Sequence, residues 1–65
     1  MQIELNGTLI TTSATNLAIL LNEQGLDASC VATALNGEFV PRSHYANTEL
    51  TERAKVEVLS PMQGG

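Results

Sequence analysis

The chain has 65 residues, which is enough for one small domain, and its 43% hydrophobic content excludes intrinsic disorder. Seven acidic against three basic residues give a net charge of −4. The three cations are scattered among carboxylates, which argues against nucleic acid or an anionic membrane surface as a partner and favours a protein with a basic face. We see no signal-peptide pattern and no apolar run long enough to cross a bilayer, so we expect a cytoplasmic chain that is monomeric on its own.

The first elements in chain order form a predicted β-hairpin. Residues 1–5 alternate between apolar and polar, with Ile3 and Leu5 on one face, and residues 8–12 are rich in β-branched side chains. Between them stands Asn6-Gly7, a pair that favours the type I′ turn because both central positions of that turn need positive φ.

A helix of about two and a half turns is predicted next. Its apolar stripe consists of leucines at helical spacing, namely Leu17, Leu20 and Leu21. Thr15 or Asn16 can cap its start, and Gly25 fits the left-handed position just past its end, where Leu26 can fold back on the last turn. So short a helix must pack on a sheet to be stable.

The second half of the chain predicts three more strands. Residues 31–35 form one strand, whose core-facing side is left open because both sides are mostly apolar. A second Asn-Gly pair, Asn36-Gly37, leads into a short strand at 38–40 that Pro41 stops. Residues 42–50 are irregular or a short helical turn, and residues 55–59 form the last strand, with Val56 and Val58 facing inward.

This element order predicts an α+β fold, the β-grasp (ubiquitin-like) arrangement. The last strand inserts beside the first, which gives a mixed sheet of four or five strands with one main helix packed on one face. We expect a β-grasp domain at 1–60 and a flexible C-terminal Gly-Gly tail at 61–65.

The side chains supply no self-contained active site. One cysteine and one histidine exclude an internal disulfide and a structural zinc site. Cys30 is expected to be a buried or half-buried thiol and His44 a solvated surface residue, and Glu49, Glu52 and Glu57 are expected to form a solvated rim. We therefore expect a protein that is not an enzyme and that binds no cofactor or metal.

The chain end offers chemistry of its own, because Gly64-Gly65 leaves no side chain around the terminal carboxylate. Such a tail can thread a narrow channel in another protein. Transfer of its carboxylate to the α-phosphate of ATP would give an acyl-adenylate, which a sulfur nucleophile turns into a thiocarboxylate and an amine into an amide. A terminus without a function is the alternative.

The chain resembles the ThiS family, the sulfur carriers of thiamin thiazole synthesis. The opening "NG" strand, "NLAILLNEQG", "ALNGEFVPR" and "VEVLSPMQGG" carry this resemblance, which covers essentially the whole chain. The sequence departs from the family pattern at Arg53-Ala54, where Gly-Asp is usual before the last strand. This departure leaves the geometry of that turn open.

The resemblance implies a protein co-substrate. A ThiF-like adenylyltransferase would use ATP and magnesium to adenylate the carboxylate of Gly65. A cysteine desulfurase system would supply the sulfur, and a ThiG-like thiazole synthase would accept it. The residues expected to bind the partner are Gly64, Gln63, Met62 and Leu59, of which Leu59 should point away from the core. Phe39 is a weaker candidate, because a lone phenylalanine is more often core.

Three alternatives remain open. A MoaD-like subunit of molybdopterin synthase also ends in Gly-Gly, but such chains tend to be longer, with a phenylalanine-containing stretch before the terminus. A ubiquitin-like modifier would end in an isopeptide bond to lysine. A plain β-grasp binding module would make no use of its tail.

Overall fold

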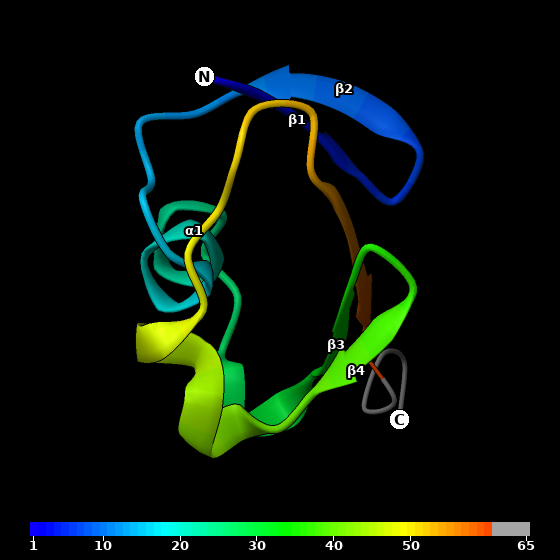
Figure 1. Cartoon of the computed structure of the whole chain (residues 1–65). Helices are drawn as coiled ribbons and strands as arrows, with labels where there is room; N and C mark the ends of the chain where they lie inside the picture. Colours follow the sequence, from blue (N-terminus) through cyan, green and yellow to red (C-terminus); the bar gives the residue numbers. More distant parts are fainter. Residues whose placement is uncertain (61–65) are drawn as a thin grey trace.

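A five-stranded sheet with one α-helix on its inner face builds the fold (Figure 1). In chain order the elements are β1 (Gln2–Leu5), β2 (Thr8–Thr11), α1 (Leu17–Glu23), η1 (Ala28–Cys30), β3 (Ala32–Leu35), β4 (Glu38–Val40), η2 (Arg42–Asn47) and β5 (Lys55–Leu59), where η marks a 3₁₀ helix. This computed structural model describes residues 1–60. The division into a domain at 1–60 and a tail at 61–65 stays a prediction, since the tail lies outside the described residues.

The strand order is β2-β1-β5-β3-β4, so the last strand of the chain lies at the centre of the sheet. β5 runs parallel to β1 and antiparallel to β3, and Val56 is the register partner of both Leu5 and Leu35. β1 and β2 form one antiparallel hairpin, and β3 and β4 form the other. The predicted β-grasp fold and the insertion of the last strand beside the first are confirmed.

Both predicted Asn-Gly turns are confirmed. The φ angles are 51° and 83° at Asn6 and Gly7, and 52° and 86° at Asn36 and Gly37. Positive φ at both central residues is the property of the type I′ turn, whose twist matches that of the flanking strands. The two hairpins therefore follow directly from local sequence.

Helix α1 begins and ends as the sequence predicts, although its 7 residues make it slightly shorter than expected. Asn16, rather than Thr15, is the cap: its side-chain oxygen accepts a hydrogen bond from the Ile19 N–H at 2.9 Å. At the other end Gly25 takes a φ of 72°, and the Leu26 N–H donates to the Leu21 carbonyl at 2.9 Å. This is the Schellman arrangement that a glycine at this position favours.

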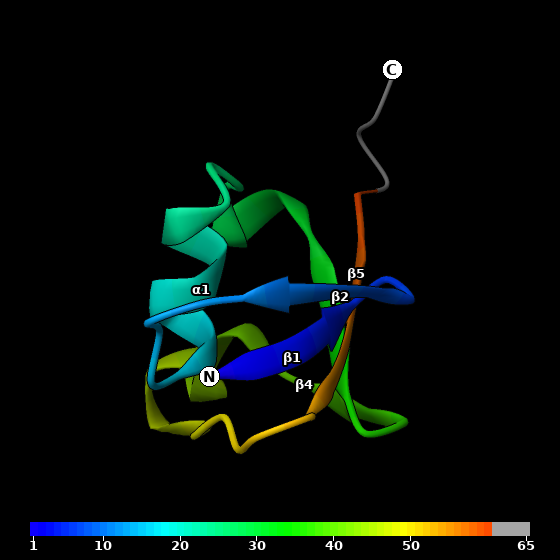
Figure 2. The same cartoon turned by 90° about the horizontal axis from the view of Figure 1, so that it is seen from above.

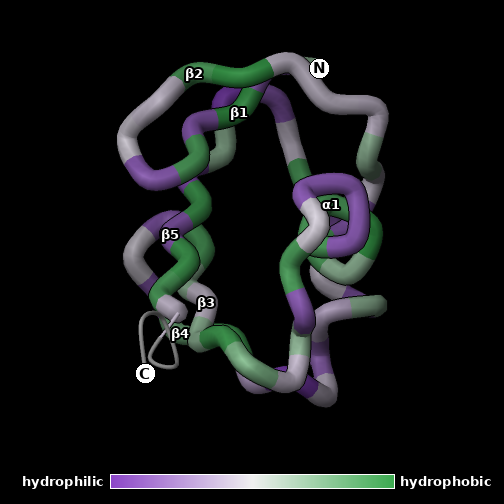
Figure 3. The backbone as a smooth tube through the Cα atoms, turned by 180° about the vertical axis from the view of Figure 1, so that it is seen from behind, coloured by the Kyte–Doolittle hydropathy of each residue, from purple (hydrophilic) through white to green (hydrophobic). Residues whose placement is uncertain are grey.

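The core lies between α1 and the inner face of the sheet (Figures 2 and 3). Its buried apolar side chains are Ile3, Ala14, Leu17, Leu20, Leu21, Val40, Tyr45, Leu50, Ala54 and Val56. The open question about β3 is settled, because Thr33 is 2% exposed and the partly buried Val31 and Leu35 pack against the core. Ala32 and Ala34 consequently face the outer side of the sheet.

Residues 42–50 take the helical alternative in part, because η2 covers 42–47 and a short extended segment follows it. Tyr45 of η2 is buried, and the Leu50 N–H donates to the Thr15 carbonyl at 3.0 Å. The segment therefore closes the core beside α1 and leads the chain back to the start of β5.

The turn before β5 keeps a left-handed residue despite its unusual sequence. Arg53 has a φ of 68°, and the Ala54 N–H donates to the Thr51 carbonyl at 3.0 Å. Positive φ at the third position only is the property of a type II turn, which favours glycine there. Arginine thus occupies a conformation that usually favours glycine.

Candidate functional site

β5 carries the candidate site, because the predicted reactive residues follow it in the chain. Its inner positions are Val56, which is 1% exposed, and the half-buried Val58. Its outer positions are Lys55, Glu57 and Leu59, and Leu59 is 69% exposed. The predicted outward orientation of Leu59 is confirmed, whereas its role in partner binding stays a prediction.

Two asparagine side chains hold β5, one near each end. Asn36 Oδ1 accepts a hydrogen bond from the Lys55 N–H at 3.0 Å, and the main-chain N–H of Asn36 donates to the Lys55 carbonyl at 2.7 Å. Near the other end, Asn6 Oδ1 accepts from the Val58 N–H at 2.8 Å, and Asn6 Nδ2 donates to the Val58 carbonyl at 3.3 Å. Each asparagine is the first central residue of a type I′ turn. The turns of the two hairpins on either side of β5 therefore also hydrogen-bond to its main chain.

An apolar patch covers part of the outer face. Phe39, the weaker of the two candidates because a lone phenylalanine is more often core, is 70% exposed and does not belong to the core. Val40 takes the inward position of β4, and alternation then places Phe39 outward, as the register partner of Ala34. Leu59 is the register partner of Ala32 on the same face. We call these four residues, Ala32, Ala34, Phe39 and Leu59, the outer patch.

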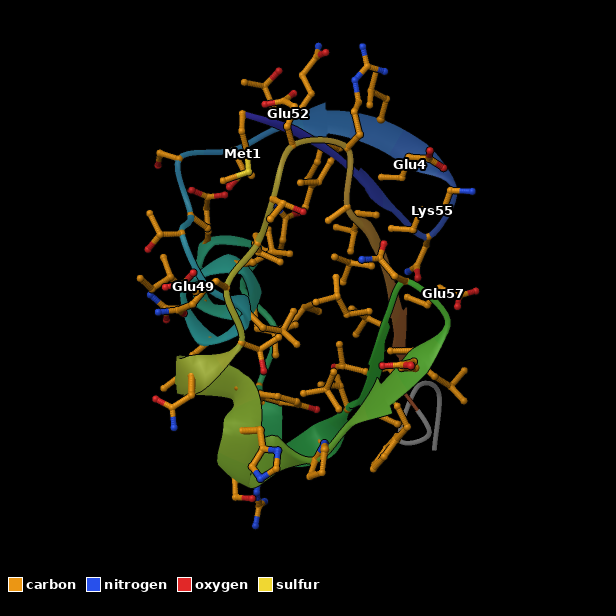
Figure 4. All side chains as sticks on the ribbon, viewed as in Figure 1. Met1, Glu4, Glu49, Glu52, Lys55 and Glu57 are labelled. Carbon is orange, nitrogen blue, oxygen red and sulfur yellow. The ribbon has the colours of Figure 1, made fainter. Side chains whose placement is uncertain are left out.

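Charged side chains border the outer patch. Glu57 lies opposite Ala34 on β5, and Lys55 lies opposite Glu4 of β1. Figure 4 shows Glu4, Lys55 and Glu57 on the side of the sheet that faces away from α1. They border an open depression beside β5, where two carboxylates flank one ammonium group. The outer face therefore combines an apolar surface with an acidic border.

Cys30 is exposed, which contradicts the predicted buried or half-buried thiol. It ends the 3₁₀ turn η1, where its Sγ lies 3.6 Å from Asp27 Oδ2, while Val31 takes the next core position. Asp27 accepts hydrogen bonds from the Ser29 hydroxyl at 2.6 Å and the Ser29 N–H at 2.9 Å. These two bonds lower the pKa of Asp27 because they favour its charged form, and the bond from the Ser29 hydroxyl has the larger effect.

The other titratable candidates lie where the sequence predicts. His44, Glu49, Glu52 and Glu57 are all exposed. Glu52 accepts a hydrogen bond from the Gln2 N–H at 2.9 Å, so it fastens the turn before β5 to the start of β1. Among residues 1–60, no three His, Cys, Asp or Glu side chains gather as a metal site would require, and no helix is long and apolar enough to cross a membrane.

The remaining predicted site residues, Met62, Gln63, Gly64 and Gly65, lie outside the described residues. Sequence reasoning missed one residue of the site, Asn6, and ranked another too low. Phe39 was the weaker candidate, although its place one residue before the inward Val40, which precedes Pro41, indicates an outward side chain. For Asn6 the sequence signalled the turn but not the side-chain bonds to β5, because these join residues 52 positions apart.

Comparisons with known proteins agree with this geometry. The family model described as "ThiS family" matches residues 2–65. A crystal structure of a thiamine biosynthesis protein (ThiS) from Geobacter metallireducens is 30% identical, with a TM-score of 0.85 and full coverage of both chains. A solution NMR structure of a thiamine biosynthesis protein from the same organism is also 30% identical, with a TM-score of 0.81, and covers 100% of this chain and 88% of that one. No curated protein sequence shows a significant match. Because the family model matches residues 2–65, the chain belongs to the ThiS family.

Proposed function

We propose that the protein is a sulfur carrier of thiamine biosynthesis and that the carboxylate of Gly65 carries the sulfur. The observation behind the proposal is that the ThiS family match extends through Gly64 and Gly65, on a fold shared with a thiamine biosynthesis protein. The central strand β5 ends at Leu59, and four residues of sequence join it to Gly64.

The chemistry proceeds in three steps. The carboxylate attacks the α-phosphate of ATP, pyrophosphate leaves, and an acyl-adenylate forms. The outer sulfur of a persulfide then attacks the acyl carbon and AMP leaves. Attack of a thiol on the inner sulfur breaks the S–S bond, which releases the thiocarboxylate and leaves a disulfide. Adenylation activates the carboxylate because AMP is a far better leaving group than oxide.

In this scheme the chain is a co-substrate and other proteins are the enzymes. Cys30 is exposed at η1 and His44 at η2, and no hydrogen bond joins the two side chains in the described part of the chain. We assign adenylation to a ThiF-like adenylyltransferase that uses ATP and magnesium, sulfur supply to a cysteine desulfurase system, and sulfur acceptance to a ThiG-like thiazole synthase.

We further assign the outer patch to docking on the adenylyltransferase. Two large apolar side chains that are about 70% exposed are unusual in so small a domain, and Leu59 lies only six residues before Gly65. The acidic border and the net charge of −4 call for a partner surface with an apolar socket edged by lysine or arginine.

The intact mass of the chain tests the carrier function. The full chain is incubated with the adenylyltransferase, magnesium ATP and a persulfide source. Replacement of one terminal oxygen by sulfur supports the proposal. Conjugates to lysine favour a ubiquitin-like modifier instead, and an unchanged mass contradicts the carrier function.

Paired substitutions test the docking assignment. We expect Leu59→Asp and Phe39→Asp each to raise the KM of the chain in ATP–pyrophosphate exchange by about tenfold or more, as loss of a central apolar contact does. Leu9→Asp is the matched control, because Leu9 is 45% exposed on β2, on the other side of β1 from β5. Equal effects of all three variants would contradict the assignment, and loss of the fold in Leu59→Asp would mean that Leu59 belongs to the core.

A further inference from the structure

The end of β5 has lost its regular neighbour on one side. β1 ends at Leu5 because the chain turns at Asn6-Gly7, yet β5 continues to Leu59. In a parallel ladder the Val58 N–H would pair with the main chain of β1. The carboxamide of Asn6 takes that place, since it accepts from the Val58 N–H at 2.8 Å and donates to the Val58 carbonyl at 3.3 Å.

The opposite side of the strand end is held by ordinary pairing. Ala32 of β3 is the register partner of Leu59. The main chain at the end of β5 is therefore fixed by β3 on one side and by a single side chain on the other. Removing that side chain frees one side of the strand end without touching the rest of the ladder.

We propose that Asn6 is a positioning residue for adenylation. Its side chain fixes the end of β5, and the segment that carries the reactive carboxylate of Gly65 begins there. This inference rests on the proposed function. Gly65 is six positions after Leu59 in the chain, which is at most about 21 Å when extended. When the adenylyltransferase holds the tail in its channel, this short reach leaves little slack, so a change in the direction of the strand end shifts the carboxylate relative to the ATP. Small misplacements of a reacting group cost much of its rate.

The molecule contains its own control. Asn36 occupies the equivalent place in the other type I′ turn and bonds the Lys55 N–H at 3.0 Å, at the start of the same strand. Glycine suits the first position of a type I′ turn, so Asn6→Gly and Asn36→Gly keep both turns and remove one carboxamide each. Asn6→Asp keeps an oxygen for the Val58 N–H and is the conservative variant.

The experiment combines residue-resolved amide hydrogen exchange with steady-state adenylation of the full chain. For Asn6→Gly we expect three- to tenfold faster exchange at Val58, as loss of the hydrogen bond that the Val58 N–H donates implies. We also expect kcat for ATP–pyrophosphate exchange to fall three- to tenfold, with KM within twofold because Leu59 of the outer patch keeps its pairing with Ala32 of β3. For Asn36→Gly we expect faster exchange at Lys55 and a kcat within twofold of the unsubstituted chain. Asn6→Asp should recover part of the lost kcat.

Two results would overturn the inference. One is an equal loss of kcat in Asn6→Gly and Asn36→Gly, which would mean that both asparagines only stabilise the fold. The other is an unchanged kcat in Asn6→Gly together with faster exchange at Val58. If the unsubstituted chain is not adenylated at all, the proposed function fails first, and the positioning role fails with it.

Discussion

Arg53→Gly should stabilise the protein. Arg53 holds a φ of 68°, and a left-handed conformation costs a residue with a Cβ roughly 1–2 kcal/mol. Glycine relieves this strain but loses about 0.4–1 kcal/mol through the larger freedom of the unfolded chain. The Arg53 side chain is exposed, so its removal costs little packing. The N–H of residue 53 still donates to the Gln2 carbonyl, at 2.6 Å in the present chain.

The difference between these two ranges centres on a gain of about 0.8 kcal/mol, which in a domain of this size raises Tm by about 3–6 °C. Urea and thermal denaturation of the isolated chain measure it. Arg53→Ala is the control, since alanine keeps the strain and should stay within about 0.5 kcal/mol of the unsubstituted chain. Arg53→Asn should gain part of the difference, because asparagine tolerates the left-handed region. A glycine variant no more stable than the alanine variant would refute the reasoning.

Three further predictions concern single side chains. Thr33→Val should stabilise the fold by about 1 kcal/mol in urea denaturation, because the buried Thr33 Oγ1 has no hydrogen-bond partner among residues 1–60. A lower stability of the valine variant would contradict this reasoning, since it would mean that the hydroxyl is hydrogen-bonded. Asn16→Ala should cost about 1 kcal/mol, as loss of a helix cap does, and an unchanged stability would deny its capping role. In the folded protein the pKa of Asp27 is lowered below its ordinary value of 3.8. The hydrogen bonds of the Asp27 carboxylate to Ser29 should therefore be complete above pH 3.8 and be lost as the pH falls through the lowered pKa. An NMR titration of the Ser29 amide should therefore show a midpoint below 3.8 that Asp27→Asn abolishes, and a midpoint at or above 3.8 would contradict the assignment.

Local signals predicted most of the fold. The turns at Asn6 and Asn36 and the helix end at Gly25 each depend on a backbone conformation that few residues adopt, so the sequence marks them strongly. The sequence could not predict which side of β3 faces the core, because the residues on both sides of this strand are mostly apolar. Only the packing of α1 on the sheet selects Thr33 for the core.

The site was predicted in part. Alternation along β5 placed Leu59 outward, since Val56 and Val58 clearly belong to the core. Phe39 was ranked too low and Cys30 was misplaced, because average burial of a residue type was applied to positions at an edge strand and a 3₁₀ turn. The bonds of Asn6 to β5 depend on strand order, which joins distant parts of the chain and leaves no local pattern.

Deletion of Gly65 tests the central claim most directly. The deletion moves the carboxylate back by about 3.5 Å of chain, out of reach of ATP bound to the adenylyltransferase. ATP–pyrophosphate exchange should therefore be abolished, as it should in Gly64→Val, where a branched side chain stands in place of hydrogen. Both variants should keep the Tm of the unsubstituted chain, because neither change touches the core residues at 3–56. Normal exchange from the chain that lacks Gly65 would contradict the account.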